Sequence, residues 1–388
     1  MKAVKIKDNI YWVGAIDWDL RNFHGYLTQK GSTYNAYLIV DDRITLIDTV
    51  KVGFTEQMLG RISDVCDPSD IDFVISNHVE MDHSGSLPAV LDLAPDAEVI
   101  TSPNGEKGLR AHFKKDWKFK VVKTGDILSP GKRSLQFVLT PMVHWPDNMV
   151  CYMPEEKILF SNDAFGQHYA SSERFDDECQ LALIMEQARK YYANIVLPYS
   201  SQVGKALKAA EPLDIDTIAP SHGIIWRKHL SELLEAYQEW SSNSTKKKCL
   251  VVYDSMWKST EMMAQSIGEA FEENGYHTVT CNLQRNHISD VMTEFIDSEY
   301  ICVGSPTLNN HLLPTVAAFL TYLMGLSPKG RKAFAFGSYG WGGQSVAEVA
   351  SYLKDSGFEV LDSLKVKYIP GQDELDGIRE KVGKLISG

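Results

Sequence analysis

The sequence predicts an α/β protein of two domains, the second of which is a doubly wound parallel sheet. From residue 249 onward, apolar strands alternate with amphipathic helices, which is typical of a parallel sheet covered on both faces. Before that point, strands and helices mix without a regular rhythm. A polar stretch without periodicity, Ser241 to Lys248, separates the two patterns and indicates a domain boundary. We therefore expect domains at residues 1–245 and 246–388.

The first domain contains recognisable local elements. Residues 34–49 form two β runs joined by Asp41 and Asp42, which predicts a hairpin. Residues 54–66 have the periodicity of an amphipathic helix, and residues 71–76 form an apolar run that predicts a strand. In the second domain the strand, loop and helix unit recurs, with strands at 249–253, 300–304 and 332–337 leading to helices at 261–275, 313–325 and 344–357.

Composition excludes several classes of function. Of the 388 residues, 44% are hydrophobic and 23% are charged, which is ordinary for a globular protein. The net charge of -12 disfavours nucleic acids and anionic membrane surfaces. The first residues lack the apolar core of a signal peptide, and no uncharged apolar run reaches the roughly 18 residues that span a bilayer. We expect a cytoplasmic protein without a nucleic-acid or membrane partner.

The spacing of the cysteines argues against a disulfide framework and against an iron–sulfur site. The six cysteines are scattered and form no C-x-x-C pair, so neither disulfides nor an iron–sulfur site is expected. Buried, reduced thiols are the expected state.

The stretch "NHVEMDHSG" places four potential metal ligands, His78, Glu80, Asp82 and His83, directly after the strand at 71–76. If the segment is extended, alternation puts residues 78, 80 and 82 on one side. The pattern predicts half of a binuclear metal site, and a plain polar loop is the alternative.

Further candidates share the same local context. His144, Asp163 and His222 each lie downstream of a short apolar run and just before a turn residue. Several such residues indicate a shared site more strongly than one alone. Asp48 also ends a strand, where it would either orient ligands or cap the strand.

In this order, Asp48, the 78–83 cluster, His144, Asp163 and His222 resemble the five motifs of the metallo-β-lactamase fold, which implies an αβ/βα sandwich. Hydrolases of that fold usually carry a histidine where Glu80 stands. Glu80 at that position is similar to the flavodiiron proteins. An extra carboxylate suits the harder iron ion, although zinc also accepts carboxylates.

The resemblance implies a ligand set for two irons. His78, Glu80 and His144 would hold one iron, Asp82 and His222 the other, and Asp163 would bridge them. His83 matches a position that binds metal in the hydrolases but is often turned away in flavodiiron proteins. His24, in "NFHGYLT", matches a position near the open face of the irons, and Tyr199, in "VLPYSS", is a candidate pocket wall.

Three loops of the second domain predict a flavin site. The first contains neither G-x-x-x-x-G-K-[ST] nor G-x-G-x-x-G, and its hydroxyls at a helix start suit a single phosphate monoester. Two later loops mix glycine, amides and aromatic residues beyond strand ends, where doubly wound sheets bind ligands. Together they resemble a flavodoxin that holds FMN, with Lys258 where flavodoxins carry glycine. The candidate residues are Ser255, Met256, Trp257, Lys258, Ser259, Thr260, Ser305, Pro306, Thr307, Leu308, Asn309, Asn310, Ser338, Tyr339, Gly340, Trp341, Gly342 and Gly343.

The resemblance to flavodiiron proteins covers nearly the whole chain, in a two-domain form without a fused rubredoxin. It implies an oxidoreductase that takes electrons through FMN, from rubredoxin or a deazaflavin cofactor, and reduces O2 to water, NO to N2O, or both. It also implies a head-to-tail homodimer or a dimer of dimers. Two alternatives are a dizinc hydrolase of the glyoxalase II or lactonase type with an appended flavodoxin, and an electron-transfer protein with a structural or sensory metal site.

Overall fold

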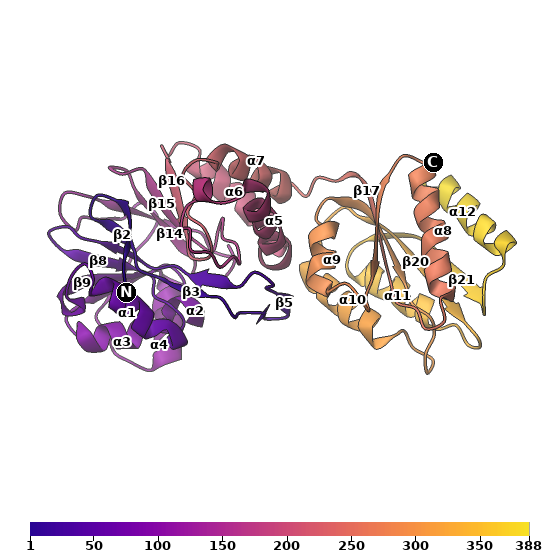
Figure 1. Ribbon diagram of the computed structural model, residues 1–388, viewed down its shortest axis with the longest axis horizontal. Helices are drawn as coiled ribbons and strands as arrows, with labels where there is room; N and C mark the ends of the chain where they lie inside the picture. Colours follow the sequence, from indigo (N-terminus) through magenta and orange to yellow (C-terminus); the bar gives the residue numbers. More distant parts are fainter. Residues whose placement is uncertain (388) are drawn as a thin grey trace. The chain divides into compact units, whose positions relative to one another are not determined.

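The computed structural model describes residues 1–387, which divide into two compact units (Figure 1). The first unit comprises residues 1–24, 28–191 and 201–238. The second comprises residues 25–27 and 192–200 and the chain from residue 239 onward. The division expected between residues 245 and 246 falls in the short link between helix α7 (Leu230–Ser241) and strand β17 (Lys246–Tyr253).

The first unit contains a seven-stranded mixed sheet in the order β1-β2-β7-β8-β9-β10-β11. The predicted hairpin is present, because β7 and β8 pair in antiparallel fashion, whereas β8 to β11 run parallel to one another. The strands are β1 (Val4–Lys7), β2 (Ile10–Trp12), β7 (Tyr37–Ile39), β8 (Ile44–Ile47), β9 (Ile71–Ser76), β10 (Glu98–Thr101) and β11 (Phe119–Val121).

A second sheet of five strands, ordered β12 to β16, packs against the first. Its members are β12 (Ile127–Leu128), β13 (Leu135–Leu139), β14 (Met149–Met153), β15 (Ile158–Asn162) and β16 (Thr217–Pro220). Buried side chains of both sheets, such as Phe73, Phe137 and Phe160, form one core cluster between them. The short strands β3 (Ala15–Asp17), β4 (Asn22–Phe23), β5 (Tyr26–Leu27) and β6 (Ser32–Tyr34) lie between β2 and β7 in the chain.

Helices cover the outer faces of this sandwich. The helices α1 (Thr55–Ile62), α2 (Met81–Ser84), α3 (Leu87–Leu93) and α4 (Pro103–Phe113) belong to the first sheet, where Met58, Val90 and Leu109 pack on its outer face. Beside the second sheet lie α5 (Leu181–Tyr191), α6 (Ser200–Ala210) and α7 (Figure 1). Short turns of helix connect them: Val52–Phe54, Pro68–Asp70, Asp176–Glu178, Tyr192–Val196 and Leu197–Tyr199. The expected αβ/βα sandwich is confirmed.

The second unit is the expected doubly wound sheet. Its five strands are all parallel, in the order β18-β17-β19-β20-β21, which is the flavodoxin-like order. Helices α8 and α12 pack on one face, and α10 and α11 contact each other beside the other (Figure 1). The elements after β17 are α8 (Ser259–Glu273), β18 (His277–Asn282), α9 (Ile288–Phe295), β19 (Ser298–Gly304), α10 (Pro314–Leu326), β20 (Lys332–Tyr339), α11 (Ser345–Asp355), β21 (Glu359–Lys367) and α12 (Gln372–Ser387).

The polar stretch at the domain boundary is shorter than predicted. Strand β17 begins at Lys246, so three residues expected in the linker belong to the strand, and Lys246 and Lys248 pair with neighbouring strands. The buried Lys248 ammonium lies 2.7 Å from Glu294 and 3.2 Å from Asp297, and these carboxylates offset the cost of burying its charge. Nothing in the sequence signals this strand start, because the two carboxylates are distant from Lys248 in the chain.

Within residues 1–387, no helix combines the length and the apolar character that a membrane crossing requires.

Candidate metal centre and flavin site

The 78–83 cluster lies at a strand-to-helix turn. Strand β9 ends at Ser76, and α2 begins at Met81, so Asp82 and His83 are helical rather than extended. The amides of His83 and Ser84 both donate to the Glu80 carbonyl, at 3.0 and 2.9 Å. The prediction that residues 78, 80 and 82 share one side of an extended segment is therefore wrong. The turn instead sends His78 and Glu80 to one group of ligands and Asp82 to another.

Asp48 holds two of the loops that carry the ligands. Its carboxylate accepts the Asn77 amide at 2.8 Å and the Asn77 side chain at 3.2 Å, and the Ser221 hydroxyl lies 3.5 Å away. Asn77 precedes His78, and Ser221 precedes His222. Asp48 thus joins the end of β8 to both loops, which combines the two roles considered for it.

The first group consists of His78, Glu80, His144 and Asp163, whose potential ligand atoms all lie within 4.8 Å of one another. The Nε2 atoms of His78 and His144 lie 3.3 and 3.6 Å from Glu80 Oε2. They lie 3.6 and 3.2 Å from Asp163 Oδ2. These side chains follow β9, β13 and β15 in the chain, so three separate strands bring them together.

The second group consists of Asp82, His83 and His222. His222 Nε2 lies 3.2 Å from Asp82 Oδ2, and His83 Nε2 lies 3.4 Å from Asp82 Oδ1. Both imidazoles also approach Asp163 Oδ1, at 3.5 and 3.1 Å. Asp163 therefore directs one carboxylate oxygen toward each group.

The buried polar atoms of these groups fit a pair of bound cations. Within residues 1–387, both carboxylate oxygens of Asp82 and Asp163 and both ring nitrogens of His83 are buried and make no well-aligned hydrogen bond, although imidazole and carboxylate atoms approach as closely as 3.1 Å. Buried polar atoms in that state are rare unless a metal or water completes them. Burial alone would raise the pKa of Asp163, but the His83 and His144 imidazoles hold it well below its usual range. A carboxylate-rich donor set with imidazoles is also chemically suited to iron.

His24 and Tyr199 have different surroundings. His24 Nε2 lies 3.1 Å from Glu80 Oε1, and its side chain is 75% exposed. Tyr199 ends the short helix Leu197–Tyr199, which belongs to the second unit. A different tyrosine, Tyr191 at the end of α5, is buried with its ring 6.0 Å from that of His222. Sequence reasoning missed Tyr191, because the run "ARKYYAN" carries no signal beyond helix periodicity.

The first flavin loop, residues 254–258, leads into the N-terminus of α8. Ser255 Oγ is buried and has no hydrogen-bond partner within residues 1–387, which suits a phosphate oxygen. Lys258 adopts a left-handed backbone conformation with a φ of +69°. Glycine is favoured in that conformation, which explains why flavodoxins carry it at this position.

The other two loops are tied to the first and to each other. Thr260 Oγ1 lies 2.9 Å from Ser338 Oγ, and the Thr307 amide donates to the Ser338 carbonyl at 3.0 Å. Trp257 and Trp341 remain 86% and 80% exposed, as expected of aromatic side chains beside an open ligand site. Hydroxyls, a helix N-terminus and exposed indoles therefore meet at one edge of the sheet, and this edge fits FMN.

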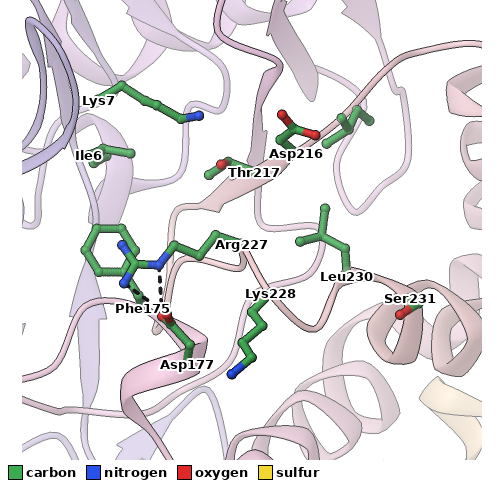
Figure 2. A pocket seen from close by; sticks show the side chains of 11 residues that line it. Ile6, Lys7, Phe175, Asp177, Asp216, Thr217, Arg227, Lys228, Leu230 and Ser231 are labelled. Atoms are coloured by element: carbon green, nitrogen blue, oxygen red, sulfur yellow. Dashed lines mark hydrogen bonds and ion pairs between the residues drawn. The ribbon is translucent and has the colours of Figure 1, made fainter.

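An open hollow of about 770 Å³ lies elsewhere on the first unit, at the start of β16 and α7 (Figure 2). It contains none of the predicted site residues. Its Arg227 pairs with Asp177 at 2.8 Å and covers the Phe175 ring at 3.6 Å (Figure 2). These contacts explain the arginine as a structural residue.

Comparisons with known proteins agree with both domains. Residues 33–223 match the ODP family beta lactamase, and residues 251–381 match flavodoxin. The chain is 44% identical to a nitric oxide reductase of Moorella thermoacetica, over 99% of this chain and 98% of that protein. It is 41% identical to a rubredoxin-oxygen oxidoreductase of Megalodesulfovibrio gigas, over 98% and 96%. The flavodiiron protein of Giardia intestinalis superposes with a TM-score of 0.96 at 36% identity, covering 99% of this chain and 96% of that one.

Fold and sites together define a flavin- and metal-dependent oxidoreductase built from a metallo-β-lactamase-like domain and a flavodoxin domain. The chain belongs to the flavodiiron proteins. Its cofactors are FMN and a non-haem diiron pair. The dizinc hydrolase alternative is not favoured, because the two relatives described above span both domains and are named as a reductase and an oxidoreductase.

Proposed function

We propose that this protein reduces O2 to water, NO to N2O, or both, with electrons that a rubredoxin-type donor delivers through FMN. The observation that carries the proposal is the position of Asp163, which directs one oxygen to each of two ligand groups. A single metal would need only one of those groups. The names of the two reductase relatives support the same pair of substrates.

We assign His78, Glu80 and His144 to one iron, Asp82 and His222 to the other, and Asp163 to both. His83 Nε2 points toward Asp82 and Asp163, so it is available to the second iron. When bound, the iron pair supplies redox chemistry and an open coordination position for a diatomic substrate. Buried carboxylates offset the positive charge of the irons and favour their ferric state.

Both reductions consume protons, and side chains of the protein can supply them to the site. His24 Nε2 contacts Glu80 Oε1, while most of its ring faces solvent. It can therefore hold a proton at Nε2 between solvent and the first iron position. We give Tyr191 the role of pocket wall first expected of Tyr199, because Tyr191 is buried beside His222.

We assign the FMN to the three loops that contain Ser255, Thr307 and Ser338, and the two domains to residues 1–245 and 246–388. The matched family ranges 33–223 and 251–381 support that division. A head-to-tail homodimer, or a dimer of such dimers, in the cytoplasm is the expected working form, because it would bring the flavin of one subunit to the irons of the other.

The decisive experiment combines metal analysis with anaerobic stopped-flow spectroscopy. We expect two irons and one FMN per chain, and reoxidation of the reduced protein by O2 or NO much faster than that of free flavin. Two zincs without iron would contradict the diiron assignment. Reoxidation no faster than that of free flavin would show that the protein is an electron carrier and not a terminal reductase. Steady-state rates with rubredoxin as donor would then rank O2 against NO.

A further inference from the structure

Asp147 makes two hydrogen bonds to the segment that carries His78. Its Oδ2 accepts from His78 Nδ1 at 2.9 Å and from the Val79 amide at 2.8 Å. The carboxylate is buried, and the same oxygen that faces His78 accepts the hydrogen bond from the Val79 amide. An ionised carboxylate only accepts, so the proton of His78 lies on Nδ1. Nε2 is then the ring nitrogen that faces Glu80 and Asp163, and it is the atom left to bind a metal.

The loop that carries Asp147 is anchored at Asp147 itself and at the next residue, Asn148. The Ser102 hydroxyl donates to the Asp147 carbonyl at 2.7 Å and also caps α4 by accepting from the Gly105 amide at 2.9 Å. Asn148 accepts from the Trp145 amide at 2.6 Å and donates to Asn162 at 2.8 Å. Because the loop also contains His144, one short segment supplies a ligand of the first group and orients another.

Within residues 1–387, the outer ring nitrogen of His222 in the second group faces no carboxylate. His222 Nδ1 lies 2.7 Å from the backbone carbonyl of Thr33, which is a neutral acceptor. A carboxylate partner makes an imidazole a stronger donor to a metal than a carbonyl partner does. The two groups therefore differ in the hydrogen-bond acceptor at the outer ring nitrogen of a ligand histidine, which is a carboxylate for His78 and a carbonyl for His222.

We propose that Asp147 is a positioning residue that locks the Nδ1–H tautomer of His78 and strengthens its Nε2 toward the metal beside Glu80. This rests on the proposed ligand assignment. The consequence is an asymmetric pair. The metal of the first group is held more tightly, and stays ferric more readily, than it would be without the charge of Asp147.

The test compares Asp147→Asn with Ser102→Ala in the full-length holoprotein. Asn has nearly the same shape and can still accept from Val79, but it lacks the charge that acts on His78. Ser102→Ala loosens the same loop at the Asp147 carbonyl and leaves the contact with His78 in place. The readouts are iron retained against a chelator, the midpoint potentials of the iron pair followed by electron paramagnetic resonance, FMN content and melting temperature.

For Asp147→Asn we expect roughly 10- to 100-fold weaker retention of one iron and a higher midpoint potential, with FMN unchanged. Ser102→Ala should lower the melting temperature but keep both irons and their potentials. Equal iron loss in both variants, or an unchanged potential in Asp147→Asn, would overturn the proposal and leave loop anchoring as the role of Asp147. Absence of iron from the unmodified protein would instead count against the proposed function itself.

Discussion

At the scale of single residues, Glu80 is the most informative side chain. Its Oε2 lies within 3.6 Å of two imidazoles, and its Oε1 lies 3.1 Å from His24. A histidine at this position would replace an anionic donor by a neutral one and leave more positive charge on the metal pair. The choice of carboxylate thus bears directly on whether the centre supports redox chemistry.

Glu80→His should weaken iron retention by about tenfold or more and lower O2 and NO reduction, while FMN stays bound. Iron per chain, flavin absorbance and steady-state rates measure the three effects. Glu56→His, on the exposed surface of α1, is the matched control and should change none of them. A Glu80→His protein with full iron and unchanged rates would rule out a direct role for Glu80.

The backbone of Lys258 is strained at the first flavin loop, because a φ of +69° costs conformational free energy in any residue that has a Cβ atom. Lys258→Gly should raise the stability of the flavin-free protein by about 1 kcal/mol, measured by denaturant unfolding. Lys258→Ala removes the same charge but keeps the strain, so it should give no such gain. Equal stability of the two variants would show that the strained conformation has no cost here.

At the scale of elements, the flavin site depends on contacts between loops that follow three different strands. Thr260 is bonded to Ser338, whereas Ser255 Oγ has no partner within the described residues 1–387. The two hydroxyls therefore differ in what their removal should do. We expect the Ser255 hydroxyl to bind only FMN, and the Thr260 hydroxyl both to bind FMN and to hold the loop of Ser338 in place.

Ser255→Ala should weaken FMN binding by roughly tenfold or more, as expected for a lost hydrogen bond to a charged group, and leave the flavin-free stability unchanged. Thr260→Ala should weaken FMN binding and also cost about 1 kcal/mol of flavin-free stability. Fluorescence titration with FMN and denaturant unfolding separate the two effects, and the iron content should remain full in both. Unchanged FMN affinity in Ser255→Ala would remove Ser255 from the site.

At the scale of the whole molecule, the two units have separate hydrophobic cores. The metal ligands come from the first unit and the flavin loops from the second. Loss of one cofactor should therefore destabilise one core more than the other. Among the described residues, the buried carboxylates of Asp82 and Asp163 make no well-aligned hydrogen bond, so the first unit is the one expected to depend on its metals.

Removal of iron by a chelator under reducing conditions should lower the melting temperature of the first unit, because bound metal stabilises only the folded site. The flavin unit should keep its FMN and its own transition. Differential scanning calorimetry with flavin fluorescence distinguishes the two transitions, and re-addition of ferrous iron is the control for reversibility. Release of FMN together with the iron would contradict independent units.

Much of the fold was predictable, because hydrophobic periodicity is a local signal. The strand–helix alternation of the second domain and the hairpin at 34–49 both correspond to observed elements. The start of β17 at Lys246 was missed, because the carboxylates that neutralise Lys248 lie about fifty residues downstream. Tyr191 was missed for a similar reason, since its position beside His222 depends on how α5 packs.

The chemistry of the candidate site could be predicted from the residue types and their order in the chain. His78, Glu80, His144, Asp163 and His222 could be named as ligands from strand ends and from the resemblance to flavodiiron proteins. Which oxygen of Asp163 faces which group, the helical turn that separates Asp82 from Glu80, and the contact of Asp147 with His78 required the tertiary structure. The physical reason is that chain order specifies which donors are present, whereas packing of two sheets and their loops determines the directions in which those donors point.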